Sequence, residues 1–68
     1  MEEKLLEIIK KIIENKGTEP KVATFQEVRS ATEHIEDKTL LNLSFKVLVK
    51  NKKLGIRDGI NSILIEVL

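Results

Sequence analysis

The strongest chemical signal in this 68-residue sequence is a run of cationic residues in its C-terminal half. Five of them fall within residues 46–57, a segment without Asp or Glu, so that the local charge is +5. Ammonium and guanidinium groups gathered in this way can neutralise phosphates, although an ordinary solvated lysine face has the same composition. The candidate binding residues are Lys38, Asn42, Lys46, Lys50, Lys52, Lys53 and Arg57.

Asn42, Lys46 and Lys50 share one face whichever structure residues 38–50 adopt. Their spacing of four places them on one side of a helix, and the same even spacing places them on one face of a strand. The β-branched and aromatic residues of this segment favour a strand, which would have Leu43 and Phe45 on its inner face. Asp37 favours a helix, because an aspartate can cap its first turn. Both structures remain open at this point.

Residues for catalysis or metal binding are scarce. The chain has no cysteine, which excludes disulfides, thiolate metal sites and cysteine nucleophiles. His34 is the single histidine, so a histidine-based metal site is not expected. The three glycines stand apart and form no phosphate-binding loop. We therefore expect a protein that is not an enzyme, with no catalytic residues, cofactor or metal and no small-molecule substrate.

The composition indicates a single domain over residues 1–68. Charged residues make up 34% of the chain and nearly cancel at +1, so a basic site must come from the distribution of charge. Phe25 and Phe45 are the only aromatic residues, which removes the usual stacking platforms for single-stranded bases. No signal-peptide core and no apolar run of about 20 residues is present. These features predict a cytoplasmic protein without a membrane segment, or a nuclear one in a eukaryote.

The N-terminal segment is predicted to be an amphipathic helix over residues 2–16. Its Leu and Ile residues fall on one arc, with Ile9 and Ile12 near the centre, and its charged residues fall on the other. Gly17 suits the left-handed position after a helix, and Pro20 hinders continuation.

A second, shorter helix is predicted over residues 25–33, after a connector at 18–24. Thr24 and Glu27 match a capping box, with a hydroxyl at the N-cap and a carboxylate three residues later. Phe25, Val28 and Thr32 would face inward. The alternative is a strand through residues 21–29.

The C-terminal part is predicted to be a β-hairpin. Residues 54–57 form its first strand, Asp58-Gly59 its two-residue turn with glycine at a positive φ, and residues 62–68 its returning strand. A terminal helix is the alternative, because the apolar residues from Ile60 onward also keep helical spacing.

Taken in order, these elements resemble a winged helix-turn-helix domain over nearly the whole chain. The helix at 2–16, the capped helix at 24–33 and a third helix after Asp37 correspond to its helices. Residues 54–57, Asp58-Gly59 and residues 62–68 correspond to its wing. The resemblance implies a small α+β domain with an N-terminal amphipathic helix, further short helices and a C-terminal β-hairpin, and with Leu40, Phe45 and Leu48 of the third helix directed inward.

The function that this resemblance implies is non-enzymatic binding of nucleic acid, most simply duplex DNA, in regulation or replication. Asn42 and Lys46 would approach base edges. Phosphates would be held by Lys50, Lys52, Lys53 and Arg57.

Two further interpretations stay open. The chain also resembles a double-stranded RNA-binding domain of order α-β-β-β-α, a helix packed on an antiparallel sheet, with strands at Pro20–Val22 and Phe45–Val49. It could instead be a self-associating structural or regulatory module, a homodimer, since a thin core is often completed by a partner. In that case the run 63–68 would add an edge strand to a second chain.

Overall fold

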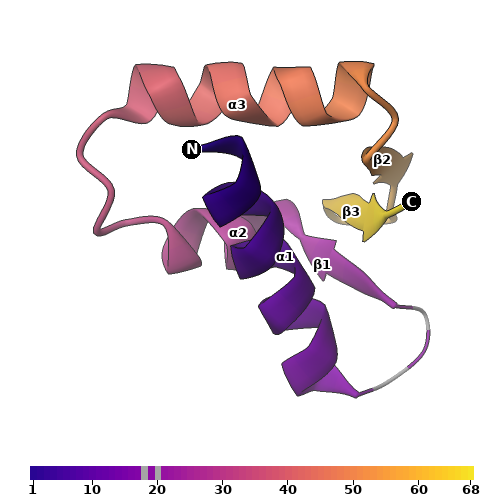
Figure 1. Cartoon of the computed structure of the whole chain (residues 1–68). Helices are drawn as coiled ribbons and strands as arrows, with labels where there is room; N and C mark the ends of the chain where they lie inside the picture. Colours follow the sequence, from indigo (N-terminus) through magenta and orange to yellow (C-terminus); the bar gives the residue numbers. More distant parts are fainter. Residues whose placement is uncertain (18, 20) are drawn as a thin grey trace.

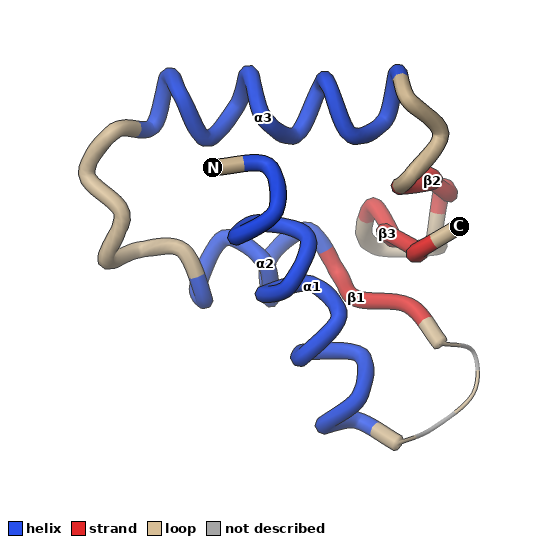
Figure 2. The backbone as a smooth tube through the Cα atoms, in the orientation of Figure 1, coloured by secondary structure: helices blue, strands red, loops and turns tan. Residues whose placement is uncertain are grey.

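The protein folds into three helices and a three-stranded antiparallel sheet, as described by a computed structural model that covers residues 1–17, 19 and 21–68. Figure 1 shows α3 along one side of the molecule, with α1 beginning beside it and running away from it, and Figure 2 shows the strands gathered beside the helices. This is the α+β fold predicted from the sequence. The elements in chain order are α1 (Glu2–Lys16), β1 (Val22–Thr24), α2 (Phe25–Ala31), α3 (Lys38–Lys50), β2 (Leu54–Asp58) and β3 (Ile63–Val67).

Helix α1 has the predicted bounds and the predicted end. Gly17 adopts a left-handed conformation with φ of 59°, and its N–H donates to the carbonyl of Ile13 at 3.4 Å. Glycine suits this position because it lacks the Cβ that makes positive φ costly. The centre of the buried face lies one turn earlier than predicted: Leu5 and Ile9 are buried, whereas Ile12 is only partly buried. The predicted effect of Pro20 lies outside the described residues.

The connector and the second helix combine two of the predicted alternatives. Residues 22–24 are a short strand, β1, and α2 begins directly after it, so that neither a pure connector nor a strand through 21–29 is correct. The capping box is confirmed: Thr24 Oγ1 accepts from Glu27 N at 3.1 Å, and Glu27 Oε1 accepts from Thr24 N at 2.9 Å. Val28 and Thr32 are buried as predicted.

Phe25 does not face inward and is 45% exposed. As the first residue of α2, it projects back toward the helix start, beyond the part of the helix that packs on the core.

Residues 38–50 form a helix, which decides the main alternative of the sequence analysis. Asp37 caps α3, with Oδ1 accepting from Leu40 N at 2.9 Å. The strand interpretation is therefore wrong, and so is the α-β-β-β-α order, because Phe45–Val49 are helical and the chain ends in a strand. Leu48 is buried as expected and Phe45 packs against the core, but Leu40 is 44% exposed. Leu40 continues the buried line of Ser44 and Leu48, but it lies in the first turn of α3, one turn before the first buried residue of the helix.

The sheet has the order β1-β3-β2, so the last strand of the chain is the central one. Ile65 of β3 lies opposite Ala23 on one side and Ile56 on the other. The C-terminal hairpin is confirmed, and a terminal helix is excluded. The expectation that the run 63–68 forms a free edge is wrong, because β3 is paired on both sides and the edges are β1 and β2.

The hairpin turn is longer than predicted. Asp58 pairs with Ile63, which leaves four residues in the loop, and Gly59 has no positive φ. Gly59 is needed for a different reason. Its N–H donates to Ser62 O at 2.8 Å, and a Cβ at this position would lie 2.6 Å from the same oxygen.

The core lies between the helices and the inner face of the sheet. Helix α1 contributes Leu5 and Ile9 to it, α3 contributes Leu48, and the strands β2 and β3 contribute Leu54 and Ile65. All five side chains are almost fully buried. Within the described part of the chain, no helix combines the length and the apolar character that a membrane crossing requires.

A polar contact joins α1 to β1 and α2 outside the core. Lys16 Nζ donates to Glu27 Oε1 at 2.7 Å and to the carbonyl of Val22 at 3.3 Å. The hydrogen bond from Lys16, followed by that from the Thr24 backbone, lowers the pKa of Glu27 below its ordinary value. Glu27 thus both caps α2 and holds the end of α1 beside it.

The first expected outcome concerns the buried face of α1. Ile9 has no exposed surface, so Ile9→Ala should cost about 2–5 kcal/mol through lost transfer energy and the cavity left behind. That is a large share of the roughly 3–10 kcal/mol expected for a domain of this size. Lys10→Ala, on the exposed face, should change stability by no more than about 0.5 kcal/mol. Urea melts of the two variants make the comparison, and equal effects would contradict this packing.

The second expected outcome concerns pH. Because the pKa of Glu27 is lowered on folding, its charge contributes stability above its unfolded pKa, near 4.5, and this contribution is lost as pH falls through the folded value. Glu27→Gln keeps a residue suited to the cap but removes the charge. The wild type should therefore be more stable than Glu27→Gln at neutral pH, and the difference should shrink below about pH 4.5.

Urea melts at several pH values measure this difference. The control is Glu14→Gln, an exposed carboxylate that forms no ion pair with the described residues. A gap between wild type and Glu27→Gln that stays constant down to strongly acidic pH would refute the role of the Glu27 charge.

Candidate nucleic-acid interface

The exposed face of α3 carries Asn42, Lys46 and Lys50. All three side chains are exposed, and as residues i, i+4 and i+8 of one helix they lie on the same side. The helix contains three lysines and no acidic residue. Its opposite side is anchored in the core by Leu48, so the core packing sets the direction of this face. The structure thus brings these three predicted residues together.

Lys52 and Lys53 extend the cationic surface beyond the end of α3. The N–H of Lys52 donates to Val49 O at 3.1 Å, and that of Lys53 donates to Leu48 O at 2.9 Å. This pair of hydrogen bonds is a Schellman motif, which ends a helix with one residue in the left-handed conformation. The carbonyl of Lys53 also accepts from Leu68 N at 3.0 Å. The turn is therefore held both by the helix and by the chain end after β3.

The residue in the left-handed position of this motif is Lys52, with φ of 60°. Glycine is the usual residue here, since any side chain makes this conformation costly. Lys52 is the one residue other than glycine with positive φ in the described part of the chain. The backbone conformation of Lys52 therefore costs conformational free energy that a glycine would not cost. Its ammonium group is exposed beside Lys53 and the last turn of α3.

Arg57 lies on the edge strand β2, apart from the helix, and forms an ion pair with Glu66. Its Nε lies 3.3 Å from Glu66 Oε2 on the neighbouring strand, with 60% of the arginine side chain exposed. The ion pair leaves part of the guanidinium accessible but offsets its charge. Arg57 is therefore a weaker anion-binding group than its sequence position suggests.

Lys38 has a structural contact that the sequence did not reveal. Its Nζ donates to the carbonyl of Thr32 at 2.9 Å and to that of Glu33 at 3.4 Å, which ties the start of α3 to the end of α2. It lies about 18 Å along the helix from Lys50, given a rise of roughly 1.5 Å per residue. Lys38 therefore does not join the cluster at the other end of α3.

The charge along α3 is polarised. The Asp37 carboxylate occupies the N-terminal end as the helix cap, and Glu33 and Glu36 precede it on the exposed surface. Lys50, Lys52 and Lys53 occupy the C-terminal end. Even with Lys38 included, the side chains at the first end carry a net negative charge and those at the second a positive one, so the side-chain charges direct an anion to the second half of α3 and the turn after it.

Leu43 is a second exposed apolar residue of α3. In the strand alternative it would lie on the inner face, yet in the helix 54% of it is exposed. It lies three residues before Lys46, which makes the two neighbours on a helix, and seven before Lys50, which places Lys50 on the same face two turns further on. The spacing to Lys46 was the available signal, but it becomes informative only once the segment is known to be helical.

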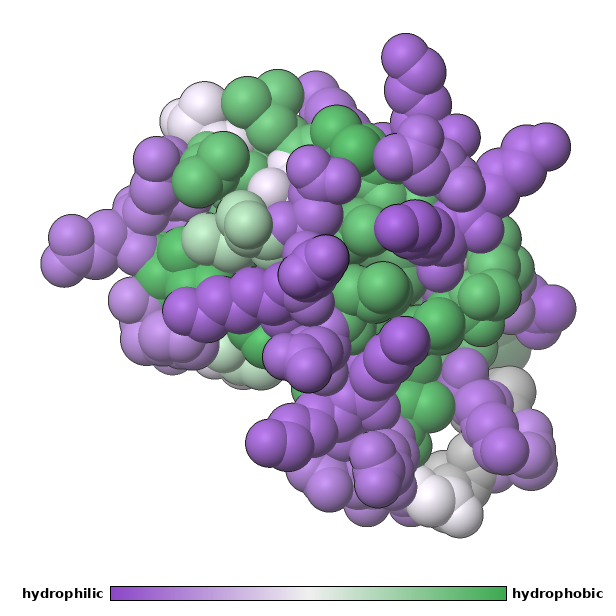
Figure 3. Space-filling view, in the orientation of Figure 1, coloured by the Kyte–Doolittle hydropathy of each residue, from purple (hydrophilic) through white to green (hydrophobic). Residues whose placement is uncertain are grey.

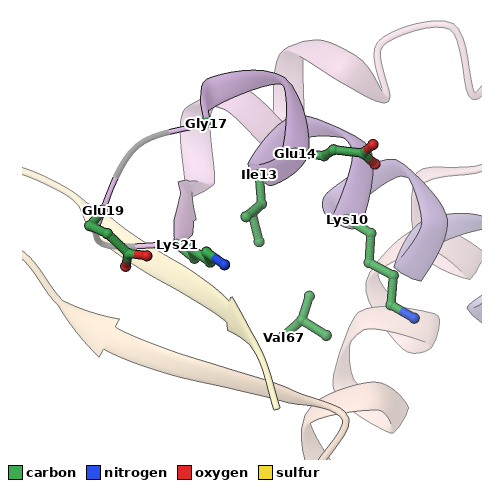
Figure 4. A pocket seen from close by; sticks show the side chains of 7 residues that line it. All are labelled: Lys10, Ile13, Glu14, Gly17, Glu19, Lys21 and Val67. Carbon is green, nitrogen blue, oxygen red and sulfur yellow. The ribbon is translucent and has the colours of Figure 1, made fainter.

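Two hollows lie near these elements, one away from the exposed face of α3 and one at its border. One is bounded by the end of α1 and by β3, where the side chains of Lys10, Glu14, Glu19 and Lys21 surround apolar Ile13 and Val67 (Figure 4). Because its rim carries both signs of charge, it favours neither anions nor cations.

The other hollow lies between α2 and α3. Both phenylalanines of the chain line it, and its polar border is formed by Arg29, Glu33, Lys38 and Asn42, so that Asn42 adjoins this hollow as well as the exposed face of α3. The Lys38 ammonium group there donates its hydrogen bonds to the backbone carbonyls of Thr32 and Glu33.

His34 lies exposed in the turn after α2, and no group of three His, Asp or Glu side chains among the residues described is placed to hold a metal ion. A scan against models of protein families found no match to this chain, and searches of curated proteins and of solved structures found none either.

The third expected outcome tests the cost at Lys52. Lys52→Gly should raise the free energy of unfolding by roughly 0.5–1 kcal/mol, because glycine adopts positive φ without the side-chain penalty. Asn51→Gly is the matched control. Its φ of −83° gives glycine no such advantage, so this change should lower stability by about 0.5 kcal/mol. Urea melts decide, and a Lys52→Gly variant that is no more stable than the wild type would show that the turn bears no such cost.

Proposed function

We propose that this chain is a non-enzymatic nucleic-acid-binding module of the winged-helix type, with duplex DNA as its partner. The observation that carries the proposal is the stretch from Lys38 to Arg57, which contains no acidic residue and exposes a cationic face along α3 and the following turn. Phosphates attract such a face without regard to base sequence. The order of three helices, the early strand and the C-terminal hairpin also supports the likeness to winged-helix domains.

The residues divide into two roles in this proposal. Asn42 and Lys46, near the middle of the exposed face, approach base edges when α3 lies in the major groove. Phosphates are contacted by Lys50, Lys52 and Lys53, with a smaller part for Arg57 because of its pairing with Glu66. Lys38 holds the turn between the helices and positions α3 without a phosphate contact.

The cost at Lys52 adds independent support. A lysine in the left-handed position gives up stability that a glycine would provide, and strained backbone of this kind is concentrated at functional sites. A phosphate contact gives the side chain a use that offsets this cost. Regulation or replication of DNA in the cytoplasm, or in the nucleus of a eukaryote, is the setting that the proposal implies.

A self-associating module is the second candidate, favoured by the apolar surface. Figure 3 shows hydrophobic side chains between the hydrophilic ones on the face that it presents. Ile60, in the hairpin loop, is 100% exposed, and Ile56 on the edge strand β2 is 50% exposed. A second copy could pair with this edge. Sedimentation at micromolar concentration separates the candidates: a tight dimer without affinity for nucleic acid would favour this one.

The fourth expected outcome tests the cationic face. The double variant Lys50→Ala/Lys53→Ala, which removes two of the proposed phosphate contacts, should bind duplex DNA more weakly than the wild type. The magnitude of the slope of log K against log salt should fall by about 2, since roughly one counterion is released per phosphate contact. Fluorescence anisotropy at several salt concentrations gives both quantities.

The matched control is Lys10→Ala/Lys11→Ala, which removes the same charge from the exposed side of α1. It should leave the salt slope nearly unchanged. Equal losses of affinity in the two double variants would mean that the binding depends only on the total charge of the protein. The absence of binding at low salt would refute the proposal.

A further inference from the structure

The exposed face of α3 contains an apolar side chain amid its polar ones. Leu43 is 54% exposed, directly follows Asn42 and neighbours Lys46 along the helix. A leucine in this place gains little from the core and cannot hydrogen-bond to a polar ligand. It adds apolar surface to the part of the chain where the cations gather.

An A·T base pair offers partners for both Asn42 and Leu43. In the major groove, adenine presents an acceptor and a donor that match an asparagine amide, and thymine presents a methyl group that apolar side chains contact. Guanine is most often read by arginine or lysine; α3 contains no arginine, so Lys46 is the residue of this face suited to a G·C pair, whereas Asn42 and Leu43 match an A·T pair. The acid-free composition of α3 also provides no carboxylate to accept from the amino group of cytosine.

We propose that Leu43 is a specificity-determining residue that contacts thymine methyl groups, and that the partner of this chain is duplex DNA with A·T pairs beneath the centre of α3. The inference rests on the proposed function, because it requires α3 to lie in the major groove. Asn42 reads the adenine, Leu43 contacts the thymine methyl, Lys46 approaches a neighbouring base edge, and Lys50 supplies attraction to the flanking phosphates. Double-stranded RNA is excluded as the preferred partner, since its major groove is too narrow to be read and uracil lacks the methyl group.

Leu43 is distinguished from the other exposed apolar residues by its position. Leu40, 44% exposed, precedes Asn42 by two residues and therefore lies toward the other side of the helix. Ile56 and Ile60 belong to the hairpin and not to α3. Among these residues Leu43 alone neighbours Lys46 and shares a helical face with both Lys46 and Lys50, so it shares a ligand with them if α3 binds one.

The experiment compares duplexes that differ in the thymine methyl group alone. The full chain is titrated with an alternating A·T duplex and with the same duplex in which deoxyuridine replaces every thymidine. The wild type should bind the thymine duplex more tightly, by about fourfold for each methyl group removed from water. Leu43→Ala should still bind but should lose this difference, and Leu40→Ala should retain it. Asn42→Ala should lose the preference for A·T over G·C duplexes.

Two results would overturn this inference while leaving the proposed function in place. One is equal affinity of the wild type for the thymine and deoxyuridine duplexes, and the other is equal behaviour of Leu43→Ala and Leu40→Ala. Absence of binding to any duplex at low salt would overturn both. A dimer that dissociates on Leu43→Ala, found by sedimentation, would assign Leu43 to a protein contact instead. Circular dichroism melts of each variant show that it is folded before it is titrated.

Discussion

The packing of Ile9, Leu48 and Ile65 into one buried cluster holds the helices on the sheet. They come from α1, α3 and the central strand β3, and none is more than 2% exposed. A chain of this size buries only about 60% of the surface that its unfolded form exposes. The chain has no cysteine and so no disulfide, so little else compensates for the stability that is lost when one of these three side chains is removed. The contact from Lys16 to Glu27 adds to this packing at the edge of the core.

The same packing decides what α3 presents to a ligand. A helix that buries Ser44 and Leu48 must turn Asn42, Leu43 and Lys46 outward, because the rotation of a helix about its axis sets both faces together. A binding site on this face therefore needs no loop to position it. The hydrogen bonds of the turn at 51–53 extend the rigid part beyond the helix end. The backbone that carries the cations is in this way held by the fold itself, which in the proposed function would lower the entropy cost of binding.

The cations at the end of α3 have a structural effect as well as a proposed function. Positive side chains at a helix C-terminus and the Asp37 carboxylate at its N-terminus both interact favourably with the helix dipole. That effect accounts for Lys50 without any ligand. It does not account for Lys52, whose backbone conformation costs more than the dipole returns to an exposed charge. Lys52 is thus the residue for which binding explains more than stability does.

The sequence alone determined the features that depend on neighbouring residues. The bounds of α1, its end at Gly17, the capping box of Thr24 and Glu27 and the presence of a C-terminal hairpin follow from local geometry, which acts over a few residues. Residues 38–50 could not be assigned in this way, because their apolar pattern satisfies both the helical and the extended period. For the same reason the exposed position of Leu43 was missed.

The tertiary structure decided what depends on residues distant in the chain. The central place of β3 requires that it pairs with β1, which lies some forty residues earlier in the chain; in this pairing Ala23 lies opposite Ile65. The exposure of Phe25 and Leu40 follows from where each helix meets the core. The partners of Lys38 and Arg57 lie on other elements, so their side chains read as free cations in the sequence. A one-dimensional pattern specifies which face of an element is apolar, but only packing specifies what each face meets.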